Sequence, residues 1–359
     1  MTPFASWVDA DLAAVAGVDT RALLAPIRGL APAAWPAPAD SGRLEARAVE
    51  NRVSGELGRR IAAAGTLAPG WAATLRPSLE ARSLLHGHEN ALKAAAVRAA
   101  GEAFAARAIE AVALKGFHYA YGVYADPADR PFGDVDLLVR RANLPAAEEA
   151  LLALGFTHGR SQSGAGAMEK SFLRELGSRV VLDIDLHWKL MGALSLVREM
   201  RPDDEGTRER STPAFPGLRF PSPEDALCFA AVNLVRHGFR PLGNILDFRE
   251  LLRGADPGLL ASRAAATRTS TALSAALALA QALFGTVVPE PLARALVLPR
   301  WQRALFRRLL KPESLAQTEL ASGVTARYAL KILSQDGARG VARAAAALPG
   351  LAARKLTMR

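Results

Sequence analysis

The sequence predicts an α+β fold: a small mixed sheet with flanking helices, preceded by N-terminal helices and followed by a C-terminal all-α domain. Two observations carry this prediction. Short apolar runs that alternate with polar residues lie between residues 110 and 190, as half-buried strands require. From Ser222 onward every apolar run instead has helical length and spacing, with proline and glycine between the runs.

The chain divides into four segments by composition and periodicity. The first contains helical fragments at Trp7–Val15 and Leu44–Ala64, joined by a proline-rich irregular stretch at 31–38. The expected boundaries are 1–75 for this helical or irregular segment, 76–215 for the α/β domain, 216–335 for the all-α domain and 336–359 for a basic tail.

The α/β domain begins with a helix, because apolar residues recur at steps of three and four from Ser78 to about Ile109. A helix over 144–154 is expected to stop at Gly155, since glycine commonly ends helices. The remaining elements are a strand at 111–114, a short helix at 117–124, a loop at 125–133, a strand from Asp134, a Gly/Ser-rich loop at 161–167, and strands at 172–176 and 179–187.

Composition limits the cellular setting. Half of the 359 residues are hydrophobic, which favours a globular chain, and the single cysteine, Cys228, excludes an internal disulfide framework. Met1–Ala14 lacks the basic region of a secretory signal. The uncharged stretch Thr269–Val288 contains several polar residues and favours a packed core helix over a membrane span. We therefore expect a cytoplasmic protein without a membrane span.

The net charge of +10 is concentrated at one end. From Arg300 to the end the chain carries twelve basic and three acidic residues, whereas the preceding part is nearly neutral. This C-terminal segment is suited to an acidic partner, an anionic surface or nucleic acid, or it forms a solvated helical face.

The most informative feature is a pair of carboxylates in an apolar run. Asp134 and Asp136 lie within Phe132–Val139, and strand alternation places both on one face while Val135 and Leu137 point to the other. Two adjacent anions are costly without a positive partner, and Mg²⁺ prefers carboxylate oxygen. The pair therefore predicts a metal site.

A later strand carries a second alternating set. Asp183, Asp185 and His187 share one face of this strand, and the apolar residues between them face the core. If the two acidic strands are neighbours, three or four carboxylates converge, which suits two Mg²⁺ ions, with Mn²⁺ as the alternative metal.

Upstream residues favour a polyphosphate ligand. Gly116 closes a strand where a helix begins, so that phosphate can approach the backbone N–H groups there. Lys115 supplies a point charge and Arg130 is within reach of the same phosphates. The alternative interpretations are a glycine that only permits the turn and two surface charges.

These residues carry a resemblance to a known family. The segments Ala113–Gly116, Arg130–Val139 and Asp185–Trp188 resemble the bacterial uncharacterised nucleotidyltransferase family, within the superfamily that includes DNA polymerase β. Ser222–Asp225 and the helices after it are similar to the same family. The resemblance covers about residues 85–255 and implies a nucleotidyltransferase-type sheet.

The resemblance also implies an activity: Mg²⁺-dependent transfer of a nucleoside monophosphate from an NTP to a hydroxyl or phosphate acceptor. Asp134, Asp136 and Asp185 would be the catalytic and metal-binding residues, and Asp185 would help to deprotonate the acceptor. Asp183 is the alternative third carboxylate. The residues assigned to nucleotide binding are Lys115, Gly116, Arg130 and Gly133.

Two other functions remain open at this point. Family members usually have Gly-Gly or Gly-Ser where this chain has Gly116-Phe117, which favours a catalytically degenerate module that binds nucleotide or a partner. A glycosyltransferase also uses Asp-x-Asp, but it would need a larger parallel sheet before the motif. The acceptor is not identified, and nucleic acid is less favoured because the catalytic region is nearly neutral.

Overall fold

The computed structural model of the protein describes residues 17–159, 168–177, 179–191, 199–310 and 324–346. The chain forms two compact units. The sheet unit comprises Leu84–Ser195 and Pro202–Ala226, and the helical unit comprises Met1–Ser83, Leu196–Arg201 and Leu227–Arg359. The predicted α+β fold with flanking helices is confirmed.

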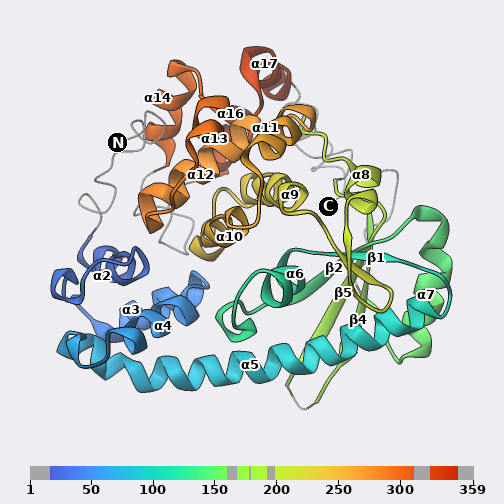
Figure 1. Ribbon diagram of the computed structural model, residues 1–359, viewed down its shortest axis with the longest axis horizontal. Coiled ribbons are helices and arrows are strands. Elements are labelled where there is room, and N and C mark those ends of the chain that lie inside the picture. The colour runs from blue at the N-terminus through green and yellow to red at the C-terminus, as the bar shows by residue number, and fades with distance from the viewer. Residues whose placement is uncertain (1–16, 160–167, 178, 192–198, 311–323, 347–359) are drawn as a thin grey trace. The chain divides into compact units, whose positions relative to one another are not determined.

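A seven-stranded mixed sheet forms the centre of the sheet unit, in the order β3-β4-β5-β2-β1-β7-β6 (Figure 1). The pairs β2–β5 and β1–β7 are parallel, and the other neighbouring pairs are antiparallel. The strands are β1 Ala111–Leu114, β2 Asp134–Leu138, β3 Thr157–His158, β4 Glu169–Glu175, β5 Val181–His187, β6 Thr212–Phe215 and β7 Leu218–Phe220.

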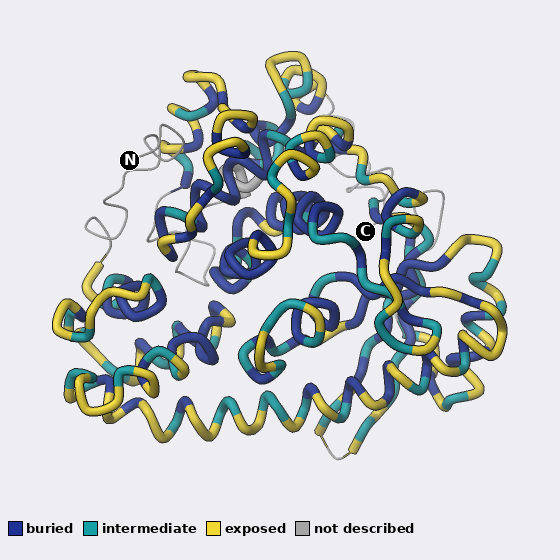
Figure 2. Tube along the Cα trace, viewed as in Figure 1, coloured by how far each residue is buried: buried dark blue, intermediate teal, exposed yellow. Residues whose placement is uncertain are grey.

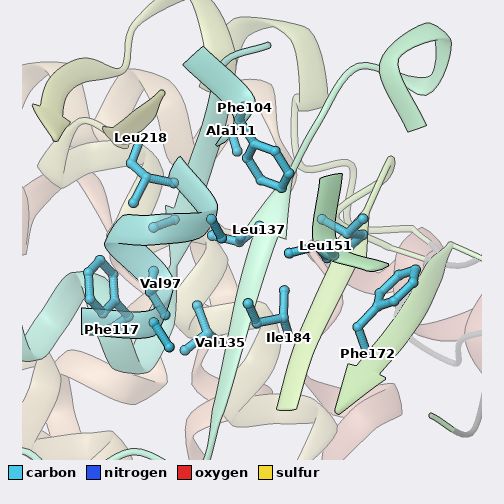
Figure 3. Packing of buried hydrophobic residues seen from close by; sticks show 14 of the residues in the cluster. Val97, Phe104, Ala111, Phe117, Val135, Leu137, Leu151, Phe172, Ile184 and Leu218 are labelled. Carbon is cyan, nitrogen blue, oxygen red and sulfur yellow. The ribbon is translucent and has the colours of Figure 1, made fainter. Parts of the chain in front are cut away.

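Helices of the sheet unit cover the apolar face of the sheet. Val135, Leu137 and Ile184 are fully buried and pack in one cluster with Val97 of α5 and Leu151 of α7 (Figure 3). Burying each such side chain stabilises the fold by about 1.5–3 kcal/mol. These helices are the second part of α5 Gly70–Ala105, α6 Lys115–Gly122 and α7 Leu144–Ala153. The sheet unit also contains α8 Asp204–Glu209 and the 3-10 turns η3 Pro127–Asp129 and η4 Arg141–Asn143.

The hairpin of β6 and β7 extends the sheet beyond β1 and was not expected from the sequence. Gly217 in its turn has a left-handed backbone, with φ +66. The turn packs on α5 so closely that a Cβ at Gly101 would lie 2.5 Å from the carbonyl oxygen of Pro216. Both positions therefore require glycine.

The helical unit contains the remaining described helices, and α12 Ser270–Phe284 is almost entirely buried. Thirteen of its 15 residues are buried, and it ends at Gly285 in a left-handed cap. Most of its trace has the dark blue of buried residues in Figure 2. Other members are α2 Val18–Ile27, η1 Pro32–Ala34, α3 Ser41–Glu50, α4 Ser54–Ala64, η2 Gly65–Leu67, the start of α5, most of α9 Pro223–Arg236, α10 Leu242–Leu252, α11 Pro257–Ala266, α13 Glu290–Ala295, α14 Arg300–Leu309, α16 Val324–Leu333 and α17 Gly337–Ala346.

A buried ion network joins two helices of this unit. Arg249 of α10 donates to Glu56 of α4 at 2.7 Å and to the carbonyl oxygen of Ile27 at 3.1 Å. Burial alone would raise the pKa of Glu56. The charges and hydrogen bonds of Arg249 and of two arginines on α4 outweigh burial, and they hold that pKa below its ordinary value.

Several expectations for the helical segments can now be compared with the structure. The predicted helix over 44–64 is two helices, because Arg52 between them has a left-handed backbone with φ 58. Cys228 is buried in α9, as expected. Among the described residues, no helix combines the length and apolarity that crossing a bilayer requires. The predicted helix at 7–15 and the loop at 161–167 lie outside the described residues.

Candidate active site

The two acidic strands lie side by side. Strand β2 pairs with β5 in parallel, with Asp134 opposite Asp183 and Asp136 opposite Asp185. The residues between them on both strands are buried in the apolar cluster, so alternation turns all four carboxylates to the other face. Neighbouring strands are only about 4.8 Å apart, and four acidic side chains therefore occupy one small area.

Strand β4 adds polar groups to the same face. Its Ser171 lies opposite Asp185, and its Glu169 lies opposite His187. The Ser171 hydroxyl donates to Asp183 Oδ1 at 2.6 Å. Sequence analysis did not single out either residue, because Lys170 and Arg174 obscure the alternation of this strand.

The negative charge of Asp136 is balanced by two side-chain contacts. It is buried, and its Oδ1 accepts from Lys115 Nζ at 2.7 Å and contacts His187 Nε2 at 2.9 Å. Burial alone would raise the pKa of Asp136. The positive charge of Lys115 and the hydrogen bond from His187 reverse that effect and hold the pKa far below its usual value. Asp136 is therefore ionised.

The pKa of Asp185 is shifted in the opposite direction from that of Asp136. Partial burial and the negative charges of Asp183, Asp136 and Glu169 raise its pKa to about 7, and His187 offsets only part of this rise. The pKa of Asp183 is also raised, by burial and by the neighbouring β2 carboxylates, although its bond with Ser171 acts against this. The β5 side of the site is thus short of positive charge.

A cation fits the donor atoms on this side. Ligand atoms of Asp136, Asp185 and His187 all lie within 4.8 Å of one another. Carboxylate oxygens suit Mg²⁺ and Mn²⁺, and imidazole nitrogen is more readily accepted by Mn²⁺. The group contains Asp185, the favoured third carboxylate, and does not contain Asp183; Asp134 is outside it as well.

A family model described as uncharacterised nucleotidyltransferase matches residues 37–285, more than two thirds of the chain and all seven strands. The chain belongs to this family. The resemblance expected from the sequence is therefore confirmed, over a longer stretch than its motifs indicated. No curated protein and no solved structure matched in the corresponding comparisons.

The turn that the sequence predicts to bind phosphate lies between β1 and α6. A Cβ at Gly116 would lie 2.6 Å from the Cβ of Phe132, so close packing of α6 on the segment before β2 requires glycine there. The left-handed residue of the turn is Lys115, with φ 43. Its ammonium points to Asp136, so the structure places Lys115 among the carboxylates.

Arg130 and Gly133 lie in the segment that leads into β2. Arg130 is buried, donates to the carbonyl oxygen of Pro131 at 2.8 Å and stacks over the Tyr119 ring at 5.8 Å, so it is not a surface charge. Gly133 is exposed, and its Cβ position faces open space.

Lys93 of α5 is a further cation that the sequence pattern did not reveal. It is buried and donates to the carbonyl oxygen of Phe132 at 2.6 Å. Burial lowers the pKa of Lys93, and the negative charges of Glu89 and Asp134 oppose that shift. Lys93 therefore fixes the entry to the acidic strand and lies within the electrostatic field of Asp134. A helical period alone does not show which lysine of a helix is buried.

Proposed function

We propose that this protein is a metal-dependent nucleotidyltransferase that moves a nucleoside monophosphate from an NTP to a hydroxyl or phosphate acceptor. The observation that carries the proposal is the parallel register of β2 and β5, which sets Asp134 beside Asp183 and Asp136 beside Asp185. Family membership supports the reaction class. Four carboxylates on one face repel one another, and a bound cation, which can in turn bind a polyphosphate, offsets that cost.

In this proposal Asp134, Asp136 and Asp185 hold Mg²⁺, with Mn²⁺ as the alternative. The metal neutralises charge on the phosphates and on the leaving pyrophosphate when bound. Asp136 is fixed for this role by its contacts with Lys115 and His187. Asp185 accepts the proton of the acceptor hydroxyl.

The nucleotide would be bound by the segment before β2 and by the turn after β1. Gly133 is exposed and lacks a side chain, so a phosphate can approach the backbone directly before Asp134. We assign Gly116, Lys115 and Arg130 to the same phosphates, as the family resemblance implies. The cytoplasmic location, the domain boundaries and the contact of the basic C-terminal segment with an acidic partner or anionic surface stay predictions.

A second candidate is a catalytically degenerate module that binds nucleotide or a partner. It is favoured by the turn after β1, where Phe132 fills the space beside Gly116 and Phe117 is buried, so the turn offers no hydroxyl to phosphate. The glycosyltransferase alternative gains no such support, because the described residues 17–110 contain no strand before the motif.

Thermal stabilisation by each of the four NTPs, with and without Mg²⁺, tests the proposal. A ligand at a hundred times its Kd stabilises by about 2.7 kcal/mol, and we expect a shift only when NTP and Mg²⁺ are both present. Asp134→Asn should lose the shift. Asp256→Asn is the matched control, because Asp256 caps α11 in the helical unit, whereas β2 and the carboxylates belong to the sheet unit.

Pyrophosphate release in the presence of candidate acceptors then separates the two functions. The acceptors to be tried are sugars, sugar phosphates, protein hydroxyls and RNA ends. Release that is lost in Asp134→Asn supports transfer of a nucleoside monophosphate. Stabilisation without release with any acceptor supports the degenerate module, and no stabilisation by any NTP with Mg²⁺ contradicts both.

A further inference from the structure

Positive charge is distributed unevenly over the four carboxylates. On the β2 side, Asp136 Oδ1 already has two partners, the Lys115 ammonium at 2.7 Å and His187 Nε2 at 2.9 Å. The ion pair is shielded from solvent, since the side chain of Lys115 is 19% exposed and that of Asp136 is 4% exposed. A contact of this kind is stronger than a surface ion pair.

Within the part of the chain that the structure describes, the carboxylates of β5 have no comparable ion pair. Among the described residues, no lysine or arginine lies within ion-pair distance of Asp183 or Asp185. Asp183 accepts a hydrogen bond from the hydroxyl of Ser171, which carries no charge. The missing positive charge is therefore on the β5 side, next to the group formed by Asp136, Asp185 and His187.

The backbone fixes Lys115 in its place. Leu114, the last residue of β1, lies opposite Asp136 in the antiparallel register, and Lys115 follows it at the start of α6. A left-handed backbone at a residue with a side chain is unfavourable and persists where its surroundings impose it. The left-handed conformation of Lys115 turns the chain from β1 into α6, and in this position its ammonium forms an ion pair with Asp136. Lys115 is thus built into the carboxylate site.

We propose that the Lys115 ammonium acts as a permanent second cation, so that the site takes one divalent ion, on the Asp185 side, rather than two. Two-metal sites hold their ions about 3.5–4 Å apart and share carboxylates between them. An ammonium on the shared Asp136 occupies one of those positions and repels a second divalent ion. This inference rests on the proposed function and specifies its metal content.

Counting bound Mn²⁺ by electron paramagnetic resonance tests the inference directly. The probe is Mn²⁺ with the non-hydrolysable α,β-methylene analogues of the four NTPs, added to the full chain. We expect one Mn²⁺ per wild-type chain and two per Lys115→Met chain, because methionine has similar length and no charge. Lys115→Arg, which keeps the charge, should bind one.

Lys170→Met is the matched control. Lys170 lies on β4 and pairs with Glu148 at 2.6 Å, so its replacement also removes an ion pair without touching the carboxylates. The Lys170→Met chain should bind one Mn²⁺, like the wild type. If Lys115→Met does not fold, Lys115→Gln replaces it in the same titration.

The outcomes separate the inference from the function on which it rests. Two Mn²⁺ in the wild type would overturn the inference and leave the proposed function intact, and so would a single Mn²⁺ in both the wild type and the uncharged variant. Absence of Mn²⁺ binding with every nucleotide analogue would overturn both.

Discussion

Replacing Asp185 by asparagine is expected to stabilise the metal-free protein although it removes a proposed metal ligand. Burial and the charges of Asp183, Asp136 and Glu169 raise the pKa of Asp185 from 3.8 to about 7. Three units correspond to about 4 kcal/mol at most. Because the side chain is partly exposed, solvent screening reduces the expected gain to about 1–2 kcal/mol.

The sign of the pH dependence follows from the raised pKa. The folded protein binds the Asp185 proton more tightly than the unfolded chain does, so the contribution of Asp185 to wild-type stability falls as pH rises from about 4 to about 7. Asparagine does not titrate. The advantage of Asp185→Asn is therefore complete above pH 7 and fades toward pH 4.

Urea unfolding in EDTA, followed by circular dichroism at about pH 8 and pH 5, measures both effects. Asp136→Asn is the comparison, and it should lose about 3 kcal/mol because Lys115 and His187 keep their buried donors without the anion. The two variants are expected to move in opposite directions at pH 8. A metal-free Asp185→Asn protein less stable than the wild type at that pH would refute the reasoning.

Three further predictions concern the rest of the fold. Glu56→Gln should cost about 2 kcal/mol near neutral pH, because buried Arg249 loses one carboxylate partner and keeps Glu250 at 2.8 Å. The pKa of Glu56 is lowered, so this loss should fade below about pH 4.5, and a constant difference in urea unfolding across that range would contradict it. Gly101→Ala should destabilise the protein by at least about 2 kcal/mol, because its Cβ would meet the carbonyl oxygen of Pro216. If the variant unfolded at the same temperature as the wild type, the hairpin of β6 and β7 would not pack on α5 as described. Cys228 should react with a thiol reagent only after unfolding, and rapid reaction in the native protein would contradict its burial.

The elements with a clear period were predictable from the sequence. The run at 181–187 alternates without a break, and the run at 111–114 is short, apolar and bounded, so both strands were expected close to their observed positions. The hairpin of β6 and β7 was missed because its strands have only four and three residues, contain Pro213 and pair at the edge of the sheet, where proline is tolerated. Its place beside β1 depends on tertiary contacts.

The acidic residues of the site were predictable, but their partners were not. Alternation placed Asp134, Asp136 and Asp185 on strand faces, whereas the register of β2 against β5 is a property of the folded sheet. Lys115 was expected to bind phosphate. That role stays a prediction; its contact with Asp136, which depends on its left-handed backbone, was not foreseen, because no local pattern indicates a left-handed lysine beside a glycine. The hydrogen bond of Lys93 to the carbonyl oxygen of Phe132 was not predictable either, because it depends on how α5 packs on the segment before β2.

The position of β1 between β2 and β7 has a consequence for the synthesis of this protein. β7 is made about a hundred residues after β1, so one edge of Ala111–Leu114 has no partner until the ribosome has released Phe220. An uncovered apolar edge readily pairs with another chain. Fragments for expression that end before residue 220 are therefore poor choices, whereas a fragment spanning residues 84–226 would retain every strand of the sheet.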